Sequence, residues 1–551
     1  MTATEMTRVE RNLQEMERVR ERYWLGHPGT SPTKLRWRAL TVRHCFHVLP
    51  GERVLELGAG SGLWTEQLTD VLRGENPITA AVFNEDLARQ LRAHNLRNTT
   101  VELVESLDAF PSAHFDYVVG TAILCHDEYP RTLRALQRVL KPGGQLLFFE
   151  PNFWNPQVLL KSIVPGLGRA LGQARCQSGL RRWRLMYAAS QQGFTQVDIV
   201  PYDILHPATP RSLIRFVQAL AFVLEHAPGV REICGTLYIW ARKPGREDNS
   251  RPLCNLATHR SLLRSTSFVI PCHNEEMNIE PLVRSILELY GPYVREILLV
   301  NDNSRDRTAD VVRAVAAREP RVRLVDRSPP NGVGRTLRDG YAAARGRYIL
   351  SMDCDFVQIL PEMRDMFDAI AAGHDGAIGS RFSHESVLLN YPFLKILSNR
   401  CFHVLANLLL PRRFRDISNN LKLYRADILR SLDIESDHFA ANVETGLKPL
   451  LAGHDIREVP VSWINRTIDM GSSSFRVLRV APEYARTLGR IVASAWRIRG
   501  ARSASPSPAP ALPMRTTMSG TTGDAEPVRH VPSLPMVERT RVAAAPGDHR
   551  E

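Results

Sequence analysis

The sequence predicts an α/β protein made of two doubly wound domains in tandem. Its 551 residues are too many for a single hydrophobic core. In both halves, short β-branched apolar runs alternate with segments of helical periodicity, which is typical of a mostly parallel sheet flanked by helices. Each half also carries its own motif of glycine or acidic residues directly after predicted strands. The two halves differ in motif and order, so they are not repeats.

Composition restricts the partners. The net charge of +13 favours acidic partners, such as nucleotide diphosphates, anionic lipid surfaces or nucleic acid. No DNA- or RNA-reading motif accompanies the charge, so we expect no nucleic acid. The eight cysteines form no CxxC pair, which argues against zinc and against a disulfide framework. We see no signal-peptide core and no apolar run of about 18 residues, so we expect a cytoplasmic protein.

Two segments stand apart from the rest of the chain by composition and separate the expected domains. A linker is expected at 246–264, and a disordered tail rich in Ala, Ser, Pro and Thr at 499–551. The domains are then 1–245 and 265–498. The expected strands of the first domain are 53–58, 78–83, 101–104, 115–120 and 145–150, with closing strands in FTQVDIV and GTLYIWARK. Those of the second are 267–271, 296–302, 322–326 and 348–353.

A glycine-rich turn follows the first strand. Glu56 precedes Gly58, Gly60 and Gly62, and a helical segment comes next. Glycines allow a sharp turn and close approach of a ligand, and the helix start offers free N–H groups. The GxGxG spacing led by an acidic residue, followed by FDYVV and by RVLKPGG before a strand, resembles class I S-adenosylmethionine methyltransferases over residues 50–150. The resemblance implies that this turn binds S-adenosylmethionine.

The family's other contacts match less closely. The acid expected at the end of the second strand is replaced by Val82, so Glu85 is the candidate for the ribose hydroxyls. Ser106 stands at the usual adenine-contact position. His126, after the fourth strand, is the candidate general base of methyl transfer, or else a surface loop histidine. The methyl acceptor cannot be read, and we expect residues 153–245 to cover it.

Four motifs occur in order in the second half: FVIPCHNEE, LVNDNSRDRT, NGVG and MDCD. Together they resemble family 2 glycosyltransferases, which have the GT-A fold. By this resemblance, the nucleoside of a nucleotide-sugar donor lies against Pro271, Asn274, Glu275 and Asp302. Asp353 and Asp355 follow a buried strand at i and i+2, so both can face the pyrophosphate and hold Mg²⁺ or Mn²⁺.

Later residues resemble polyprenyl-phosphate sugar transferases such as dolichol-phosphate mannose synthase. Arg381 in GSR is expected on the donor phosphate, and Arg466, Ser472 and Ser473 near the acceptor. A hydroxyl acceptor needs a general base, for which Glu444 is the first candidate and Asp416 the second, whereas a phosphate acceptor needs none. One departure is that Phe356 and Val357 follow the DxD motif, where the subfamily has Leu-Gln.

The apolar segment 393–410, bracketed by arginines, fits two arrangements. It is either a helix in a lipid interface or a buried amphipathic helix, and we expect the buried one; peripheral contact at the inner membrane face stays open. The sequence as a whole indicates a bifunctional transferase acting on a polyprenyl phosphate or glycan, with methylation of a related acceptor. The alternatives are an active glycosyltransferase with a non-catalytic S-adenosylmethionine-binding or scaffolding domain, and a non-catalytic carbohydrate-binding protein.

Overall fold

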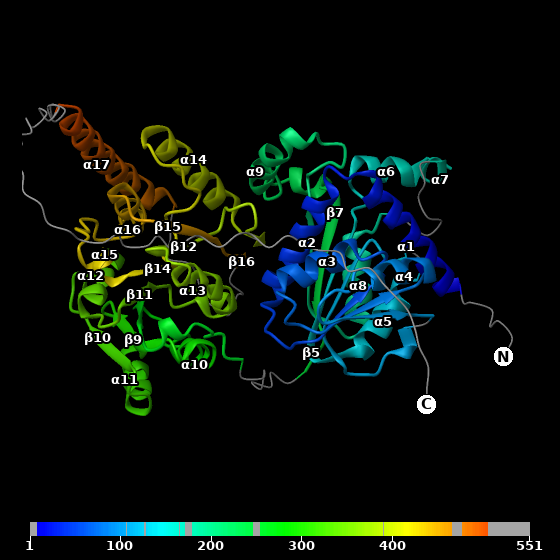
Figure 1. Cartoon of the computed structure of the whole chain (residues 1–551), viewed down its shortest axis with the longest axis horizontal. Helices are drawn as coiled ribbons and strands as arrows, with labels where there is room; N and C mark the ends of the chain where they lie inside the picture. The colour runs from blue at the N-terminus through cyan, green and yellow to red at the C-terminus, as the bar shows by residue number, and fades with distance from the viewer. Residues whose placement is uncertain are drawn as a thin grey trace, which may run out of the picture. The chain divides into compact units, whose positions relative to one another are not determined.

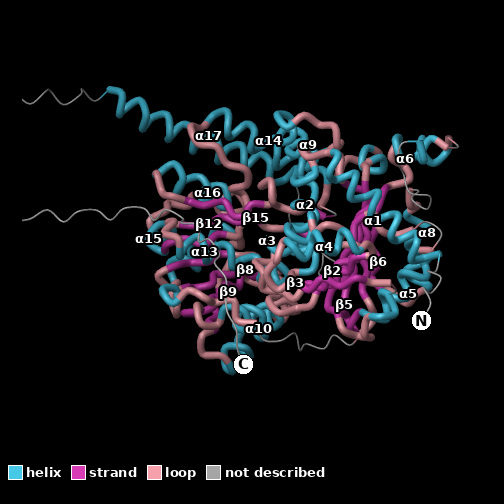
Figure 2. Tube along the Cα trace, turned by 45° about the vertical axis from the view of Figure 1, so that its right-hand side comes forward, coloured by secondary structure: helices cyan, strands magenta, loops and turns pink. Residues whose placement is uncertain are grey.

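The computed structural model describes residues 8–105, 107–125, 128–164, 166–170, 179–245, 254–389, 391–464 and 477–504. Within them lie two seven-stranded sheets and one two-stranded sheet. Both large sheets are flanked by helices (Figure 1, Figure 2). The predicted fold class is therefore confirmed. The predicted tail lies outside the described residues from position 505 onward, and α17 (Val477–Ala504) extends six residues past the expected domain end at 498.

The N-terminal sheet has the strand order β3-β2-β1-β4-β5-β7-β6. Only β7 runs antiparallel to its neighbours β5 and β6, so the carboxyl ends of β1, β2, β4, β5 and β6 share one edge. The strands are β1 (Val54–Leu57), β2 (Ile78–Val82), β3 (Thr99–Leu103), β4 (Phe115–Thr121), β5 (Leu140–Pro151), β6 (Thr195–Tyr202) and β7 (Thr236–Arg242). All seven expected strands of this half are present.

Helices cover both faces of this sheet because their apolar stripes meet its buried, β-branched strands. Leu13 and Met16 of α1 pack into one core, and Leu35 and Phe46 of α2 pack into a second. The helices of this half are α1 (Arg8–Gly26), α2 (Ser31–Phe46), α3 (Leu63–Val71), α4 (Glu85–Ala93), α5 (Tyr129–Val139), α6 (Pro156–Ile163), α7 (Leu167–Ala170), α8 (Arg182–Gln191) and α9 (Ile214–Leu224).

The second sheet has the order β10-β9-β8-β11-β14-β12-β15. β14 runs antiparallel to β11 and β12, and the other pairings are parallel. The strands are β8 (Thr266–Cys272), β9 (Val294–Asn301), β10 (Val322–Asp326), β11 (Tyr348–Ser351), β12 (Gly376–Ser380), β14 (Lys422–Arg425) and β15 (Ile456–Pro460). The carboxyl ends of β8, β9, β11 and β12 therefore lie at one edge, beside the start of β14.

The remaining elements surround this sheet, and β13 (Leu388–Leu389) pairs with β16 (Trp463–Ile464). The helices are α10 (Ile279–Tyr290), α11 (Thr308–Arg318), α12 (Val333–Ala343), α13 (Arg364–Ala371), α14 (Phe393–Leu409), α15 (Ala426–Arg430), α16 (Ala441–Ala452) and α17. Leu256 and Leu262, in the segment predicted as a linker, are buried in the core of this domain. Residues 246–253 lie outside the described ranges.

Both sheets belong to one compact unit that ends at Ile498. Glu362, which is buried, accepts hydrogen bonds from Ser462 and lies 3.0 Å from His44 Nδ1 and 3.2 Å from His47 Nδ1. Burial alone would raise the pKa of Glu362, but the two imidazoles hold it well below its usual range. The Arg364–Glu75 ion pair lies in the same region. Charged groups from the two domains thus neutralise one another where they would otherwise be buried unpaired.

Candidate functional sites

In the second domain, the residues predicted to contact a donor meet at the carboxyl edge of the sheet. Asp302 directly follows β9, and its carboxylate accepts a hydrogen bond from the Gly332 N–H at 2.7 Å and pairs with Arg327. Pro271 lies near the end of the neighbouring β8. Ligands of open α/β sheets bind in the crevice at this edge. The topology therefore brings Asp302 and Pro271 together.

The turn after β8 is held in a fixed shape. Asn274 has a φ of 59°, and its side-chain oxygen accepts a hydrogen bond from Arg305 N–H at 2.8 Å. Glu275 N–H donates to Thr308 Oγ1 at 2.8 Å, and Glu275 Oε2 accepts from Asn278 Nδ2 at 2.6 Å. These bonds join the turns after β8 and β9. Two of the predicted nucleoside contacts, Asn274 and Glu275, are thereby fixed against the segment that follows β9.

The Asp353 and Asp355 pair follows β11, which ends at Ser351, two residues earlier than expected. Asn420, just before β14, donates from Nδ2 to Asp353 Oδ1 at 2.8 Å. Sequence reasoning missed Asn420, because its role depends on β14 running antiparallel beside β11. Among the described residues, no cluster of three or more histidine, cysteine and acidic side chains could hold a metal. Two carboxylates nevertheless suit a hard cation whose other ligands are phosphate oxygens and water.

Arg381 directly follows β12 and forms a two-pronged ion pair with Asp416. Arg381 Nε lies 2.7 Å from Asp416 Oδ2, and its Nη2 lies 3.0 Å from Oδ1. Asp416 is fully buried, and although burial alone would raise its pKa, the Arg381 guanidinium holds it well below its usual range. The backbone N–H of Asp416 donates to Glu458 Oε1 at 3.1 Å. The two predicted residues are therefore one charged pair.

Two further buried groups near this pair were not predicted. His403 of α14 accepts the Ile417 N–H on Nε2 at 3.1 Å, and burial lowers its pKa to about 4. Lys422 donates to the carbonyls of Asn419 and Asn442, and burial lowers its pKa to about 7. Both hold the backbone on either side of the sequence that carries Asp416 and Asn420. No sequence motif indicates them.

Glu444 lies in α16, and its carboxylate is hydrogen-bonded and ion-paired to groups of the same domain. Its carboxylate accepts the backbone N–H groups of Glu435 and Ser436 at 2.9 and 2.8 Å, and pairs with Lys448 at 2.7 Å. It is only 1% exposed. These bonds hold the turn before α16 in place. Of the two candidate bases, Asp416 is the one that lies beside Arg381. Arg466, Ser472 and Ser473 lie outside the described residues.

In the first domain, Gly58, Gly60 and Gly62 have φ values of 68°, 62° and 95°, the left-handed region that glycine adopts without strain. Glu56 lies in β1, where burial raises its pKa to about 8. The turn thus has the backbone shape expected of a ligand cradle.

The other predicted contacts of this domain are dispersed. Glu85 begins α4, is about half exposed and lies 3.6 Å from Arg92. The acid at the end of β2 is instead Glu17 of α1, which accepts the Phe83 N–H at 3.0 Å. Ser106 and His126 lie outside the described residues. Sequence reasoning missed Glu17, although its place one residue after the apolar Met16 marks it as lying beside the buried stripe of α1.

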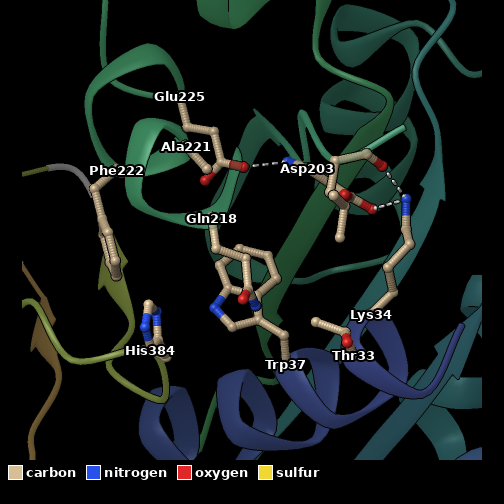
Figure 3. A pocket seen from close by; sticks show the side chains of 10 residues that line it. Thr33, Lys34, Trp37, Asp203, Gln218, Ala221, Phe222, Glu225 and His384 are labelled. Carbon is tan, nitrogen blue, oxygen red and sulfur yellow. Dashed lines mark hydrogen bonds and ion pairs between the residues drawn. The ribbon is translucent and has the colours of Figure 1, made fainter. Parts of the chain in front are cut away.

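A pocket opens between α2, α9 and the loop after β6, with His384 at one side (Figure 3). Lys34 Nζ lies 2.8 Å from Asp203 Oδ2, and Glu225 accepts the Asp203 N–H at 3.1 Å. Burial lowers the pKa of Lys34 and raises that of Glu225 to about 8. The charged groups of this pocket therefore satisfy one another. The segment expected to cover a methyl acceptor contributes most of its lining.

Comparison with known proteins assigns both domains. A methyltransferase domain family matches residues 55–148, and the family 2 glycosyl transferases match residues 267–433. The chain joins a methyltransferase to a family 2 glycosyltransferase. The predicted resemblance to these two families is thereby confirmed, and the protein is an enzyme of the transferase class.

The curated relatives of the chain include transferases of mannose. The polyprenol monophosphomannose synthase of Mycolicibacterium smegmatis is 27% identical over 242 residues, which is 43% of this chain and 88% of that protein. The dolichol-phosphate mannosyltransferase of Pyrococcus furiosus is 26% identical over 33% of this chain, and the match spans about half, 52%, of that protein. A solved methyltransferase from Thermotoga maritima aligns with 43% of this chain and 99% of its own, at 17% identity and a TM-score of 0.31.

The glycosyltransferase also has an exposed apolar surface on α14. Leu394, Leu397, Val404, Leu405 and Leu408 are exposed and recur at helical spacing on one face. The expected burial holds for one face of this helix only, where Ile396, His403 and Ala406 are buried. The apolar residues of α14 thus extend beyond the face that packs on the domain. We find no helix in the described chain that is long and apolar enough to span a bilayer.

Proposed function

We propose that the glycosyltransferase domain transfers a sugar from a nucleotide-sugar donor to a polyprenyl phosphate. The observation that carries this is the meeting of Asp302, the Asp353–Asp355 pair and the Arg381–Asp416 pair at the carboxyl ends of β9, β11 and β12. The relatives named for polyprenol or dolichol phosphate support the acceptor class. A glycan acceptor is the alternative.

In this proposal Asp353 and Asp355 hold Mg²⁺ or Mn²⁺. The cation would neutralise charge on the departing diphosphate. Asp302 and the turn at Asn274 orient the nucleoside, and Arg381, held by Asp416, meets phosphate oxygens. A phosphate acceptor is already anionic, so no side chain has to remove a proton from it. That Glu444 is engaged with Lys448 and two backbone N–H groups agrees with a reaction that needs no base there.

We propose further that the methyltransferase domain binds S-adenosylmethionine on the turn from Gly58 to Gly62 and methylates a related acceptor. The cofactor supplies the methyl group, and the domain's task is to orient it against the nucleophile. The alternative is a domain that binds the cofactor or scaffolds without catalysis. The displacement of Glu85 from the end of β2 favours this alternative, and product analysis separates the two.

The first test is product analysis. The full chain, given Mg²⁺, a panel of nucleotide sugars and a short polyprenyl phosphate, is expected to yield a glycosyl polyprenyl phosphate detectable by mass spectrometry. Adding S-adenosylmethionine is expected to raise the mass of a product by about 14 units per methyl group, because each transfer replaces a hydrogen by a methyl. Transfer to a free glycan, with the polyprenyl phosphate left unchanged, would contradict the proposed acceptor.

The lipid acceptor places this reaction at a membrane surface, and α14 supplies the contact. Two arginines, Arg412 and Arg413, follow α14 and are exposed. Trp496 of α17 is exposed beside it, with its Nε1 donating to the Leu409 carbonyl at 3.2 Å; both views show the two helices side by side (Figure 1, Figure 2). An apolar face flanked by arginines suits an anionic bilayer.

Replacing Leu394 and Leu408 by aspartate is therefore expected to weaken binding to anionic phospholipid vesicles by at least about tenfold, since each inserted leucine contributes roughly 1.5–3 kcal/mol. Vesicle co-sedimentation measures the effect. The matched control replaces Leu103 and Leu263, which are 43% and 50% exposed on other surfaces, by aspartate. Equal losses in the two double variants would show that α14 is not the membrane contact.

A further inference from the structure

Helix α1 places three charged side chains on the glycine turn of the methyltransferase domain. Glu17 accepts the Gly60 N–H on Oε1 at 3.1 Å and the Phe83 N–H on Oε2 at 3.0 Å. It thereby bridges the turn after β1 and the end of β2. Asn84 Nδ2 donates to the same carboxylate at 2.6 Å. Glu17 is fully buried at this junction.

Arg20 and Glu21 occupy the rest of the turn. Arg20 donates to the carbonyl oxygen of Gly58, and from Nη1 to that of Thr121, at the end of β4, at 3.0 Å. Glu21 accepts a hydrogen bond from the Ser61 hydroxyl and lies so close that a Cβ on Gly60 would stand 2.5 Å from its Oε2. The space that the glycines leave open is therefore filled by side chains of α1.

These side chains match the charges of the cofactor. The amino-acid end of S-adenosylmethionine carries an ammonium, which needs carbonyl oxygens, and a carboxylate, which needs N–H or O–H donors. Arg20 uses the two carbonyls, and Glu17 and Glu21 use the donors of Gly60 and Ser61. Each N–H or O–H donates to one acceptor at a time, so the carboxylates of Glu17 and Glu21 exclude a cofactor carboxylate there, and the Arg20 guanidinium at the two carbonyls repels an ammonium.

We infer that α1 is an internal competitor of the cofactor: Glu17, Arg20 and Glu21 must leave the glycine turn before S-adenosylmethionine binds there. This inference rests on the proposed cofactor of the domain. The burial of Glu17 raises its pKa, so its carboxylate is held there at an electrostatic cost that release removes.

The same helix also reaches the loop after β4. Asn12 Nδ2 lies 3.4 Å from Glu128 Oε2 and 3.7 Å from Cys125 Sγ, and Leu13 and Met16 pack in the same core as Ile123 and Leu124. Release of α1 from the turn therefore also loosens the loop where an acceptor is expected. Cofactor entry and acceptor access are coupled through one helix.

The test is calorimetry of S-adenosylmethionine binding to the full chain. The double variant Glu17→Ala/Glu21→Ala is expected to bind at least about fivefold more tightly than the wild type, because the competing state is depopulated. The matched control, Arg18→Ala/Arg22→Ala, changes exposed residues of the same helix and is expected to leave the affinity unchanged. Equal or weaker binding by the Glu17/Glu21 variant overturns the inference; weaker binding would make Glu17 part of the cofactor site.

Hydrogen exchange of the wild type is a second readout that needs no variant. Saturating S-adenosylmethionine is expected to speed exchange of the α1 amides between residues 11 and 25. Unchanged or slower exchange with bound cofactor overturns the inference. Absence of binding by both wild type and variant at millimolar cofactor would instead overturn the proposed function of this domain, and the inference with it.

Discussion

Replacing Asp355 by alanine is expected to lower the rate of sugar transfer by about 1000-fold or more, equivalent to roughly 4 kcal/mol of transition-state stabilisation. One carboxylate cannot hold a divalent cation against a diphosphate as two can, so charge develops on the leaving group without compensation. The measurement is the turnover of nucleotide sugar with a polyprenyl phosphate. EDTA is expected to abolish wild-type transfer, and Mg²⁺ or Mn²⁺ to restore it.

The matched control for this variant is Asp310→Ala. Asp310 lies in the same domain, is largely exposed and pairs with Arg313 at the surface. Its removal is expected to leave transfer unchanged, because exposed ion pairs contribute little. Wild-type transfer that continues in excess EDTA, or an Asp355→Ala variant with wild-type turnover, would refute the carboxylate–metal role.

Replacing Asp416 by alanine is expected to lower the free energy of unfolding by about 3–5 kcal/mol. The change leaves the Arg381 guanidinium buried without its partner carboxylate, so nothing compensates for the hydration that the guanidinium lost on folding. Chemical denaturation of the full chain measures it. Sugar transfer is expected to fall as well, since Arg381 loses the group that orients it.

A second variant separates stability from function. Arg381→Met/Asp416→Leu removes both charges and is expected to recover most of the lost stability while remaining inactive. Asp416 has a pKa held below the ordinary 3.8, so its contribution is complete above that pH and lost only as the pH falls through the lower, folded-state value. Lys422 adds a pH dependence of its own, because burial lowers the folded-state pKa of this lysine to about 7 and Asp416 opposes that shift by raising it. The stability cost of Asp416→Ala should therefore be larger at pH 5 than at pH 8. A single-variant cost near that of Asp310→Ala would contradict the account.

The sequence predicted the two folds well because their signals are local. Strands such as β1 and β9 are short, largely apolar runs, and each is followed directly by its turn motif. The chain order alone then places Asp302 and Asp353 at the ends of parallel strands. The sequence could not decide how much of α14 is covered: the helix has one buried face and one exposed apolar face, and periodicity does not say which neighbour covers an apolar residue.

The difference between local signals and distant partners also explains which features of the candidate sites could be predicted. The residue type and spacing of Asp353 and Asp355, and of the three glycines, follow from the sequence by itself, because a few consecutive residues create that geometry. Only the tertiary structure decided that Arg381 pairs with Asp416, that Glu444 serves the turn before α16, and that α1 lies on the glycine turn. Those pairings join residues 8 to 43 positions apart. Burial, which turns a surface charge into one that must be neutralised, exists only once the chain has folded.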